Sequence, residues 1–303
     1  MQTGGRLVRL IRGNRSLTCN YLLFRIFLPD HGRAVLHKSA KSNNARDVAP
    51  VIGGGAREYR ERAVLPALRQ HFARAWFQVG PASTAGKLAL VPDGCADLVW
   101  CRGAVHVAGP DRGLKIEFIP PGASVIGLQF QPGAAFRWLG TPASEIVDSR
   151  ISLELFWGAH GRRLSQWIAE ARSPNAIARR LELALTRRLP NVVPADPIPL
   201  AIFSAVRNRR DYVVPVARQL SADLGLSERT LRRRCHEAFG YGPKTLDRVL
   251  RFQRFLQLAR ASGIDPTADL ASDAGYSDQS HLAREARIYA GLTPGALREQ
   301  LRP

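Results

Sequence analysis

The sequence lacks any long apolar run, and it contains little cysteine and little lysine. Its longest apolar stretch near the start, residues 21–28, spans about eight residues and is interrupted by Arg25. A membrane-spanning helix needs about 20 apolar residues, and the stretch also lacks the small-residue cleavage site of a signal peptide. We therefore expect no membrane partner for this chain.

Cysteine is too sparse to hold the fold together. The four cysteines, at positions 19, 95, 101 and 235, lie far apart and include no Cys-x-x-Cys pair. Dense cysteine frameworks stabilise small secreted proteins, and closely spaced cysteine pairs bind zinc. The pattern excludes both classes, predicts neither a metal site nor a cofactor, and favours a cytoplasmic protein in a reducing environment.

Hydrophobic content and charge set wider limits. Hydrophobic residues make up 45% of the 303 residues, which excludes a wholly disordered chain and predicts two domains at roughly 100–200 residues each. The net charge is +19, but arginine supplies 39 of the 44 basic residues, a bias that a GC-rich genome can produce by itself. The charge attracts phosphate at long range without giving sequence specificity.

The basic excess is not concentrated in one region, because it amounts to +8 in residues 1–60, +6 in residues 61–190 and +5 in residues 191–303. Residues 1–58 are broken by glycines and have no helical or strand period, so we expect a basic, flexible N-terminal extension. An arm that grips DNA is the alternative. Whether part of the extension precedes the native start stays open, although Met1 is the only methionine.

Residues 59–188 predict an α+β domain. Short apolar segments bounded by Gly, Pro or Asp predict strands, and apolar residues at four-residue spacing predict helices with one buried face. Four prolines within residues 189–199 predict an extended linker and the domain boundary. The strands are expected at residues 74–79, 88–91, 96–101, 104–108, 114–119 and 124–131, and the helices at residues 153–171 and 175–189.

Residues 200–303 predict an all-α domain in which one design occurs twice. A short helix ends at a glycine, a bulky apolar residue follows, and a serine then stands where it caps the next helix. Glycine permits the left-handed backbone at a helix end, and the serine hydroxyl accepts from free amides. Two such turns, 50 residues apart, predict two helix-turn-helix units whose second helices enter the major groove. The turns are residues 220–231, with Gly225 and Ser227, and residues 270–282, with Gly275 and Ser277.

A long helix is expected to join the two units. Pro243 suits the first position of a helix, and apolar residues recur at helical spacing from 246 to 259. Residues 243–262 would span about 30 Å at about 1.5 Å per residue, while successive turns of the major groove lie roughly 34–36 Å apart. This spacing predicts recognition helices in adjacent groove segments. Asp265 and Pro266 predict the start of the second unit.

These residues resemble the DNA-binding domain of AraC/XylS-type transcriptional regulators over about a third of the chain. Cys235 and Ala286 depart from the family, which usually carries phenylalanine at both places, and they predict looser packing. The first half carries Leu226-Ser227-x-Arg229-x-Leu231-x-Arg233, Phe239-Gly240-x-Gly242-Pro243 and Arg251. The second carries Leu270-Ala271-x-x-x-Gly275-Tyr276-Ser277-Asp278-Gln279-Ser280-His281-Leu282-x-Arg284, then Gly291-Leu292-Thr293-Pro294 and Arg298.

The resemblance implies a sequence-specific DNA-binding regulator of transcription without enzymatic activity. Arginine can fork onto guanine and glutamine onto adenine. At least one member of the run 232–234 is expected to meet only phosphate or solvent, and His281 is expected to pack or to contact phosphate. Leu231 and Leu282 are expected in the core. The implied DNA contacts are Arg229, Thr230, Arg232, Arg233, Gln279, Ser280, Ala283 and Arg284.

The α+β domain resembles an uncharacterised domain that precedes AraC-type heads, over residues 90–100, 107–111, 127–133 and 139–146. This architecture implies a small-molecule effector or a homodimer, and RNA polymerase as a partner if the protein is an activator. Aspartates in turns beside apolar strands can either stabilise the turns or line a ligand pocket with an aromatic wall. Phe130 is a further candidate for that wall. The candidate ligand residues are Asp93, Cys95, Asp97, Trp100 and Asp111.

Two alternatives come from other classes of protein. A thiol-based DNA-repair or redox sensor fused to an AraC-type head would use Cys95 or Cys101 with His106 as the nearby base, and it needs a lowered thiol pKa. The zinc-bound cysteine cluster of such sensors is absent from this sequence. A nonspecific nucleoid or RNA-binding protein would not need two recognition helices.

Overall fold

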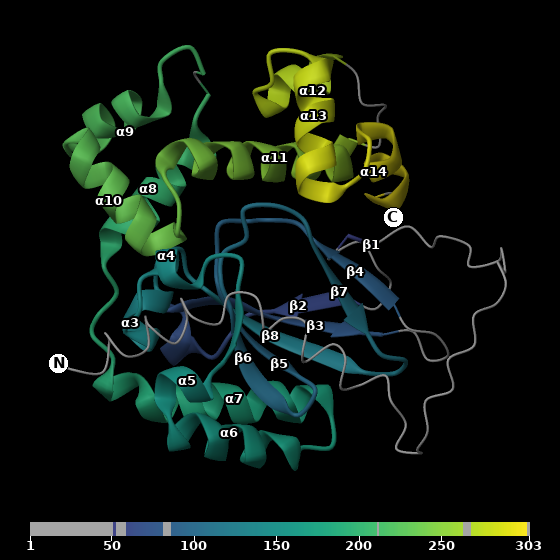
Figure 1. Ribbon diagram of the computed structural model, residues 1–303, viewed down its shortest axis with the longest axis vertical. Helices are drawn as coiled ribbons and strands as arrows, with labels where there is room; N and C mark the ends of the chain where they lie inside the picture. The colour runs from purple at the N-terminus through teal and green to yellow at the C-terminus, as the bar shows by residue number, and fades with distance from the viewer. Residues whose placement is uncertain (1–50, 53–58, 81–85, 211, 263–267, 302–303) are drawn as a thin grey trace, which may run out of the picture. The chain divides into compact units, whose positions relative to one another are not determined.

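The computed structural model describes residues 51–52, 59–80, 86–210, 212–262 and 268–301. The expected α+β half followed by an all-helical half is confirmed, as Figure 1 shows. Pro50–Pro303 form one compact unit. Of the expected N-terminal extension, residues 1–50 and 53–58 lie outside the described residues, while Val51–Ile52 form strand β1 and pair in parallel with strand β4.

The strands form two sheets. The larger sheet is antiparallel throughout, in the order β2-β3-β8-β5-β6-β9, and the smaller one has the order β1-β4-β7. All six predicted strands are present, with ends within two residues of the prediction. The sequence did not predict β2 and β9, which are short and lack an apolar alternation. The bounds are β2 Tyr59–Arg62, β3 Phe72–Val79, β4 Gly86–Leu90, β5 Asp97–Cys101, β6 Ala104–Ala108, β7 Lys115–Ile119, β8 Ser124–Phe130 and β9 Arg150–Ser152.

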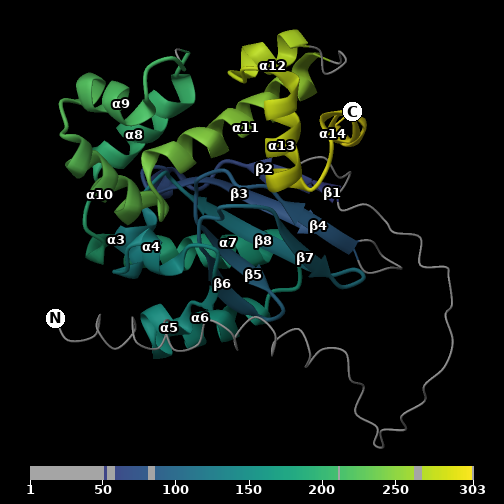
Figure 2. The same ribbon diagram turned by 45° about the horizontal axis from the view of Figure 1, so that its top comes forward.

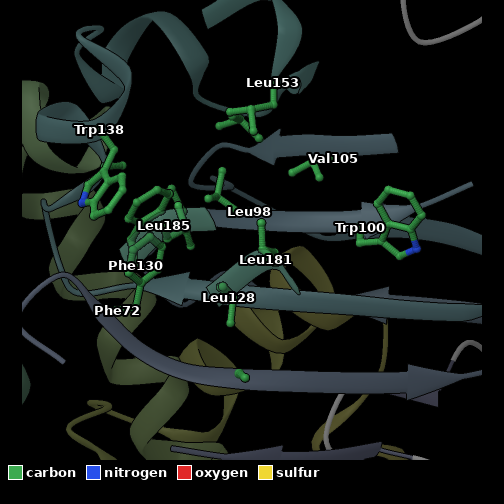
Figure 3. Packing of buried hydrophobic residues seen from close by; sticks show 14 of the residues in the cluster. Phe72, Leu98, Trp100, Val105, Leu128, Phe130, Trp138, Leu153, Leu181 and Leu185 are labelled. Atoms are coloured by element: carbon green, nitrogen blue, oxygen red, sulfur yellow. The ribbon is translucent and has the colours of Figure 1, made fainter. Parts of the chain in front are cut away.

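One face of the larger sheet carries the main core. Leu98 of β5 and Leu128 of β8 are paired in register and fully buried, and Leu181 and Leu185 of the covering helix α7 pack against them (Figure 3). Side chains alternate along a strand, so the neighbouring residues of β5 and β8 face the opposite side of the sheet. That second face holds the polar residues described below.

The helices of the first half differ from the prediction in one place. A single helix was expected at residues 153–171, but α5 ends and α6 begins at Gly158, whose φ of 56° is left-handed. Glycine adopts this conformation at little steric cost. The second expected helix is confirmed as α7. The bounds are α3 Ala135–Leu139, α4 Ala143–Ile146, α5 Glu154–Trp157, α6 Ala159–Ala169 and α7 Pro174–Arg188.

The expected Pro-rich linker is partly helical. A short 3-10 turn covers Leu189–Asn191, and helix α8 already begins at Pro197. The Asp196 carboxylate accepts a hydrogen bond from Ile198 N at 3.0 Å and caps this helix. Proline is well suited to the first turn of a helix because its missing N–H has no partner there anyway.

The helical half is built on α11, which has the expected bounds. Leu246 and Leu250 of α11 pack with α8–α10, whereas Val249, Leu256 and Ala259 pack with α12–α14, and Figure 2 shows the two groups along the helix. Asp265 and Pro266 lie outside the described residues. No helix in the described part of the chain is long and apolar enough to cross a membrane. The bounds are α8 Pro197–Asn208, α9 Val216–Leu224, α10 Glu228–Phe239, α11 Pro243–Ser262, α12 Ala268–Ala274, α13 Gln279–Ala290 and α14 Pro294–Leu301.

Candidate nucleic-acid interface

The first helix-turn-helix unit joins α9 to α10. Gly225 ends α9 with a left-handed φ of 62°. The Ser227 hydroxyl then accepts a hydrogen bond from Thr230 N at 3.2 Å and caps α10. Leu231 and Cys235 are fully buried beneath α10, so one face of the helix is fixed in the core and the other remains exposed.

The second unit joins α12 to α13 and corrects one prediction. Gly275 has the expected left-handed backbone, with φ 92°, but Ser277 does not cap α13. The cap is Asp278, whose carboxylate accepts from His281 N at 2.7 Å. The Ser277 hydroxyl instead donates to Asp278 Oδ2 at 3.0 Å. An acidic cap is also favourable next to the positive end of the helix dipole.

Asp278→Ala is expected to lower the urea concentration at the midpoint of unfolding, because it removes the N-cap of α13. Ser277→Ala is the matched control, and it should cost clearly less because its hydroxyl supports the cap without being one. Urea unfolding of both variants measures the difference. A larger loss for Ser277→Ala would restore the serine as the cap.

The eight residues expected to contact DNA lie on accessible faces of α10 and α13. They lie opposite the buried Leu231 and Leu282. The first turns of recognition helices are the parts that reach base edges, and both first turns are accessible here. The exposed residues are Arg229, Arg232, Arg233, Gln279, Ser280 and Arg284, and the half-buried ones are Thr230 and Ala283.

The three arginines at positions 232–234 of α10 point in different directions, as expected. Arg232 lies 3.7 Å from Glu228 and Arg233 lies 2.8 Å from Glu237. Such exposed pairs are worth little and can be exchanged for phosphate or base contacts. Arg234 is turned toward the Asp196 carboxylate of the α8 cap, at 3.0 Å, and so ties α10 to α8.

His281 packs within the second unit. Its ring meets the Tyr276 ring edge-on, with 5.2 Å between centroids, and its Nδ1 lies 3.3 Å from the Ser277 hydroxyl. Its Nε2 lies 3.6 Å from Glu285. These contacts agree with a packing residue.

Sequence reasoning missed the buried ion pairs of this half. Asp247 and Glu285 are 7% and 2% exposed and bind arginines from other elements. A signal was present, because both carboxylates stand at helix positions that face the core by periodicity. A buried carboxylate needs a charged partner.

The candidate ligand residues do not all lie together. Asp97 of β5 is paired in register with Gln129 of β8, on the sheet face opposite the main core. Gln129 Nε2 donates to Asp93 Oδ2 at 2.5 Å, and Trp76 Nε1 donates to Asp97 Oδ1 at 2.7 Å. Arg74 Nε donates to the Gln129 amide oxygen at 2.8 Å. Asp93 is thus bonded through Gln129 to Arg74 and Asp97 is bonded to Trp76, and we call these two half-buried aspartates the carboxylate site.

Trp100 and Asp111 lie apart from the carboxylate site. Trp100 follows Asp97 by three residues on the same strand, so its side chain points to the other face and is buried in the main core. Phe130 belongs to that core as well. Asp111 forms an ion pair with Arg150 at 2.7 Å. Trp76 takes the place that the sequence suggested for Trp100, and parity along the strand is the signal that separates them.

Burial dominates the electrostatics of the carboxylate site. It raises the pKa of Asp97 to about 7, with a further increase from the neighbouring charge of Asp93, while the hydrogen bond from Trp76 acts in the opposite direction. Burial likewise raises the pKa of Asp93. A neighbouring negative charge disfavours ionisation of a carboxyl group.

Cys95 and Cys101 do not have the environment of reactive thiols. Burial and the carboxylates Asp93 and Asp97 raise the pKa of Cys95 well above its usual value. Burial also raises the pKa of Cys101 and lowers that of His106. A nucleophilic cysteine needs a lowered pKa, so these surroundings speak against the thiol-sensor alternative.

The loop that carries Asp93 and Cys95 packs against the helical half. A methyl group at Gly94 would lie 3.1 Å from Phe203 of α8 and 3.2 Å from Leu246 of α11. Gln253 Nε2 of α11 donates to Pro92 O at 2.7 Å. The carboxylate site is therefore connected to the helix that joins the two DNA-binding units.

Comparison with known families agrees with this arrangement. A family model described as a helix-turn-helix domain matches residues 220–300, and one described as a domain of unknown function (DUF6597) matches residues 62–152. The chain therefore carries a helix-turn-helix domain in its helical half and a DUF6597 domain in its β-sheet half. No curated protein matches the chain.

Solved structures share parts of the fold. A probable AraC family transcriptional regulator from Rhodopseudomonas palustris is 24% identical, with 34% of this chain and 94% of that chain covered and a TM-score of 0.29. ToxT from Vibrio cholerae O395 is 10% identical, with 80% and 96% covered and a TM-score of 0.40. A ToxT structure with a bound unsaturated fatty acid is 11% identical, with 76% and 92% covered and a TM-score of 0.40.

Proposed function

We propose that this chain is an AraC-type transcriptional regulator that reads DNA with α10 and α13 placed in adjacent segments of the major groove. The observation that carries the proposal is the pair of capped helices with exposed faces, attached to the continuous 20-residue helix α11. At about 1.5 Å per residue, α11 is about 30 Å long. That length is close to the roughly 34–36 Å between successive groove turns.

The proposed contacts divide into base readers and residues that meet the backbone. Arginine is suited to guanine and Gln279 to adenine, while Thr230 and Ser280 can contact either a base or a phosphate. Ala283 offers a methyl group to thymine. Arg229, Arg232 and Arg233 on α10 and Arg284 on α13 supply the positive charge at the groove.

Arg232→Ala and Arg284→Ala are each expected to cost about 1–3 kcal/mol of discrimination between target and scrambled DNA, the usual effect of losing a base contact. The measurement is binding at one fixed salt concentration to both DNAs. Arg163→Ala on α6, an exposed residue of the other half, is the matched control for the lost charge. Equal losses on both DNAs would identify a phosphate contact instead.

We also propose that the β-sheet half regulates DNA binding, either by binding a small polar effector or by forming a homodimer. RNA polymerase is a further proposed partner if the protein is an activator. The protein is proposed to act in the cytoplasm. Support comes from the half-buried Asp93 and Asp97 and from the contact of their loop with α8 and α11. Tyr241 at the start of α11 is 3% exposed, and its hydroxyl has no hydrogen-bond partner among the described residues. Burial, with the charges of Asp93 and Cys95, raises the pKa of Tyr241.

Genome-wide mapping of binding sites tests this regulatory role when wild type and Asp97→Asn are compared. If the carboxylate site regulates DNA binding, the two proteins should occupy the same sites with different occupancy. Unchanged occupancy at every site would remove the carboxylate site from the proposal and leave DNA recognition untouched.

A further inference from the structure

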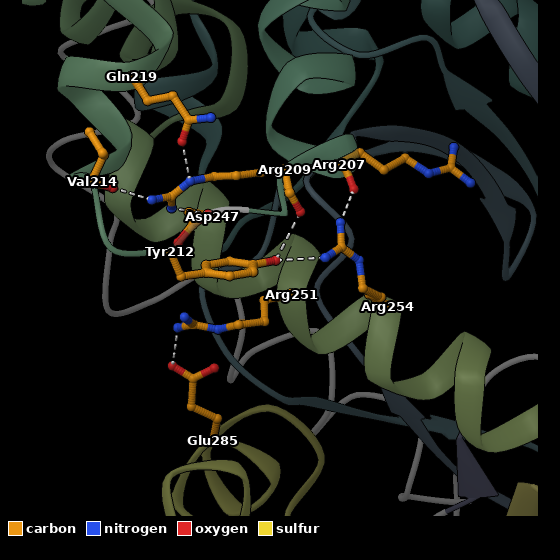
Figure 4. Close-up of polar contacts among 9 residues, drawn as sticks. All are labelled: Arg207, Arg209, Tyr212, Val214, Gln219, Asp247, Arg251, Arg254 and Glu285. Carbon is orange, nitrogen blue, oxygen red and sulfur yellow. Dashed lines mark hydrogen bonds and ion pairs between the residues drawn. The ribbon is translucent and has the colours of Figure 1, made fainter. Parts of the chain in front are cut away.

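The connection between α8 and α9 is anchored on α11. Arg209 in this connection is 5% exposed, and its Nη1 donates to Asp247 Oδ1 of α11 at 2.9 Å. Its Nε donates to Gln219 Oε1 of α9 at 2.8 Å, and its Nη2 donates to Val214 O. Figure 4 shows these bonds converging on one guanidinium group. The anchor holds the residues between α8 and α9 against the joining helix.

Tyr212 extends from this anchored connection toward the second unit. Its hydroxyl accepts a hydrogen bond from Arg254 Nη1 of α11 at 2.7 Å and donates to Arg209 O at 3.3 Å. The Arg209 guanidinium carbon lies 4.9 Å from the centre of the Tyr212 ring. The ring is therefore held at its hydroxyl end by α11 and on its face by the anchor (Figure 4).

The same ring lies directly on the turn of the second helix-turn-helix unit. A methyl group at Gly275 would lie 2.2 Å from Tyr212 Cε2, which leaves room only for glycine. The backbone of Gly275 is also left-handed, with a φ of 92°, a conformation that favours glycine. A side chain from the connection that leads into the first unit thus contacts the turn that aims the second recognition helix.

Arg251 of α11 continues the contact into α13. Its guanidinium carbon lies 5.6 Å from the Tyr212 ring centre and 5.0 Å from the Tyr276 ring centre. Its Nη2 lies 3.4 Å from Glu285 Oε1 of α13. Glu285 is held further by Arg248 Nε at 2.7 Å and by the Tyr276 hydroxyl at 3.0 Å. These contacts join the recognition helix α13 to both α11 and Tyr212.

A joining helix fixes the distance between two units but leaves their relative rotation to side-chain contacts. We propose that Tyr212, supported by Arg251 and Glu285, is a positioning residue that fixes the angle between α10 and α13. It thereby determines which spacing between two DNA segments the chain accepts. This inference rests on the proposed reading of two adjacent groove segments.

The test uses DNA selected from a random pool by the wild-type chain. Base pairs are inserted or deleted between the two recognised segments, and each segment is also presented alone. Since B-DNA turns once per 10–10.5 base pairs, a shift of two base pairs rotates one segment by about 70°. Wild type should lose at least about tenfold in affinity, because the second unit no longer engages.

Tyr212→Ala should flatten this spacing profile to less than about threefold, while binding to each single segment stays within about twofold of wild type. Tyr212→Phe keeps the ring on Gly275 but loses the hydrogen bond from Arg254 Nη1, so it should broaden the profile less than Tyr212→Ala does. Arg254→Gln should broaden the profile, whereas Arg260→Gln, which removes the same charge from an exposed position on α11, should not. Arg254→Gln also tests the inference if Tyr212→Ala fails to fold.

Each outcome decides between the two proposals. If Tyr212→Ala and Arg254→Gln keep the wild-type profile, the positioning role is overturned and two-segment reading stands. If wild type binds single segments as tightly as the pair and ignores spacing, two-segment reading fails, and the positioning role fails with it. Weaker binding to every DNA by the same factor, with an unchanged profile, would indicate a structural role only.

Discussion

Asp247→Ala is expected to lower the free energy of unfolding by about 3–5 kcal/mol, the range for removing one partner of a buried ion pair. The side chains of Arg209 and Asp247 are only 4% and 9% exposed and lie 2.9 Å apart. Removing the carboxylate leaves the Arg209 guanidinium inside the protein without its counter-charge. Gln219 and Val214 supply only uncharged oxygens to it, so they cannot replace the lost attraction.

Urea unfolding of the full chain measures this loss, and Glu237→Ala is the control. Glu237 also pairs with an arginine, Arg233, at 2.8 Å, but the two side chains are 41% and 58% exposed. Exposed pairs contribute about 0–1 kcal/mol. Asp247→Asn should fall between the two, because it keeps an acceptor for Arg209 and loses the charge. Equal losses for Asp247→Ala and Glu237→Ala would show that burial does not set the strength of this pair.

The regular elements of the fold could be predicted because local chemistry determines them. The strands end at Gly, Pro or Asp, and α11 has its start at Pro243 and an apolar stripe along one side, so both appear in the sequence. The break at Gly158 was missed because apolar spacing continues across it. The cap at Asp278 was missed because Ser277 fits the same motif one residue earlier, and only the backbone geometry selects between them.

The candidate sites were less predictable because they depend on contacts across the fold. The exposed faces of α10 and α13 follow from helical periodicity alone. The partners of Asp97 do not, because Trp76 and Gln129 come from neighbouring strands whose register the sequence did not specify. Tyr212 and Gly275 are separated by 62 positions along the chain and had no shared motif to connect them. Long-range pairing of this kind requires the structure.

For the carboxylate pair Asp93 and Asp97 we expect the opposite of the Asp247 result, because removing a charge there should stabilise the protein. Asp97 has a pKa of about 7 in the folded chain, raised by burial from 3.8. Between pH 4 and pH 7 the folded state therefore holds a proton that the unfolded state has released. The contribution of Asp97 to stability is therefore greatest below pH 4 and declines as the pH rises to about 7. A pKa shift of this size in one group changes the free energy of unfolding by on the order of 4 kcal/mol.

Asp97→Asn should therefore unfold at higher urea concentration than wild type at pH 8 and at nearly the same concentration at pH 4. Its amide oxygen can still accept from Trp76 Nε1, so the hydrogen bond is retained. Because the charge of Asp93 adds to the rise in the Asp97 pKa, Asp93→Asn should weaken this pH dependence. The double variant should lose the whole contribution of Asp97.

Asp148→Asn provides the control of opposite sign. Hydrogen bonds from Arg112 lower the pKa of Asp148, so its charge stabilises the folded state above the usual carboxyl range. That variant should lose stability at pH 8 and approach wild type at low pH. If Asp97→Asn instead destabilises the protein at pH 8, the Asp97 carboxylate is charged and paired in the folded state, and Arg74 and Arg150, the nearby cations, outweigh the cost of burial. The direction of the Asp97 pKa shift thus decides whether Asp97 is protonated or charged in the folded protein.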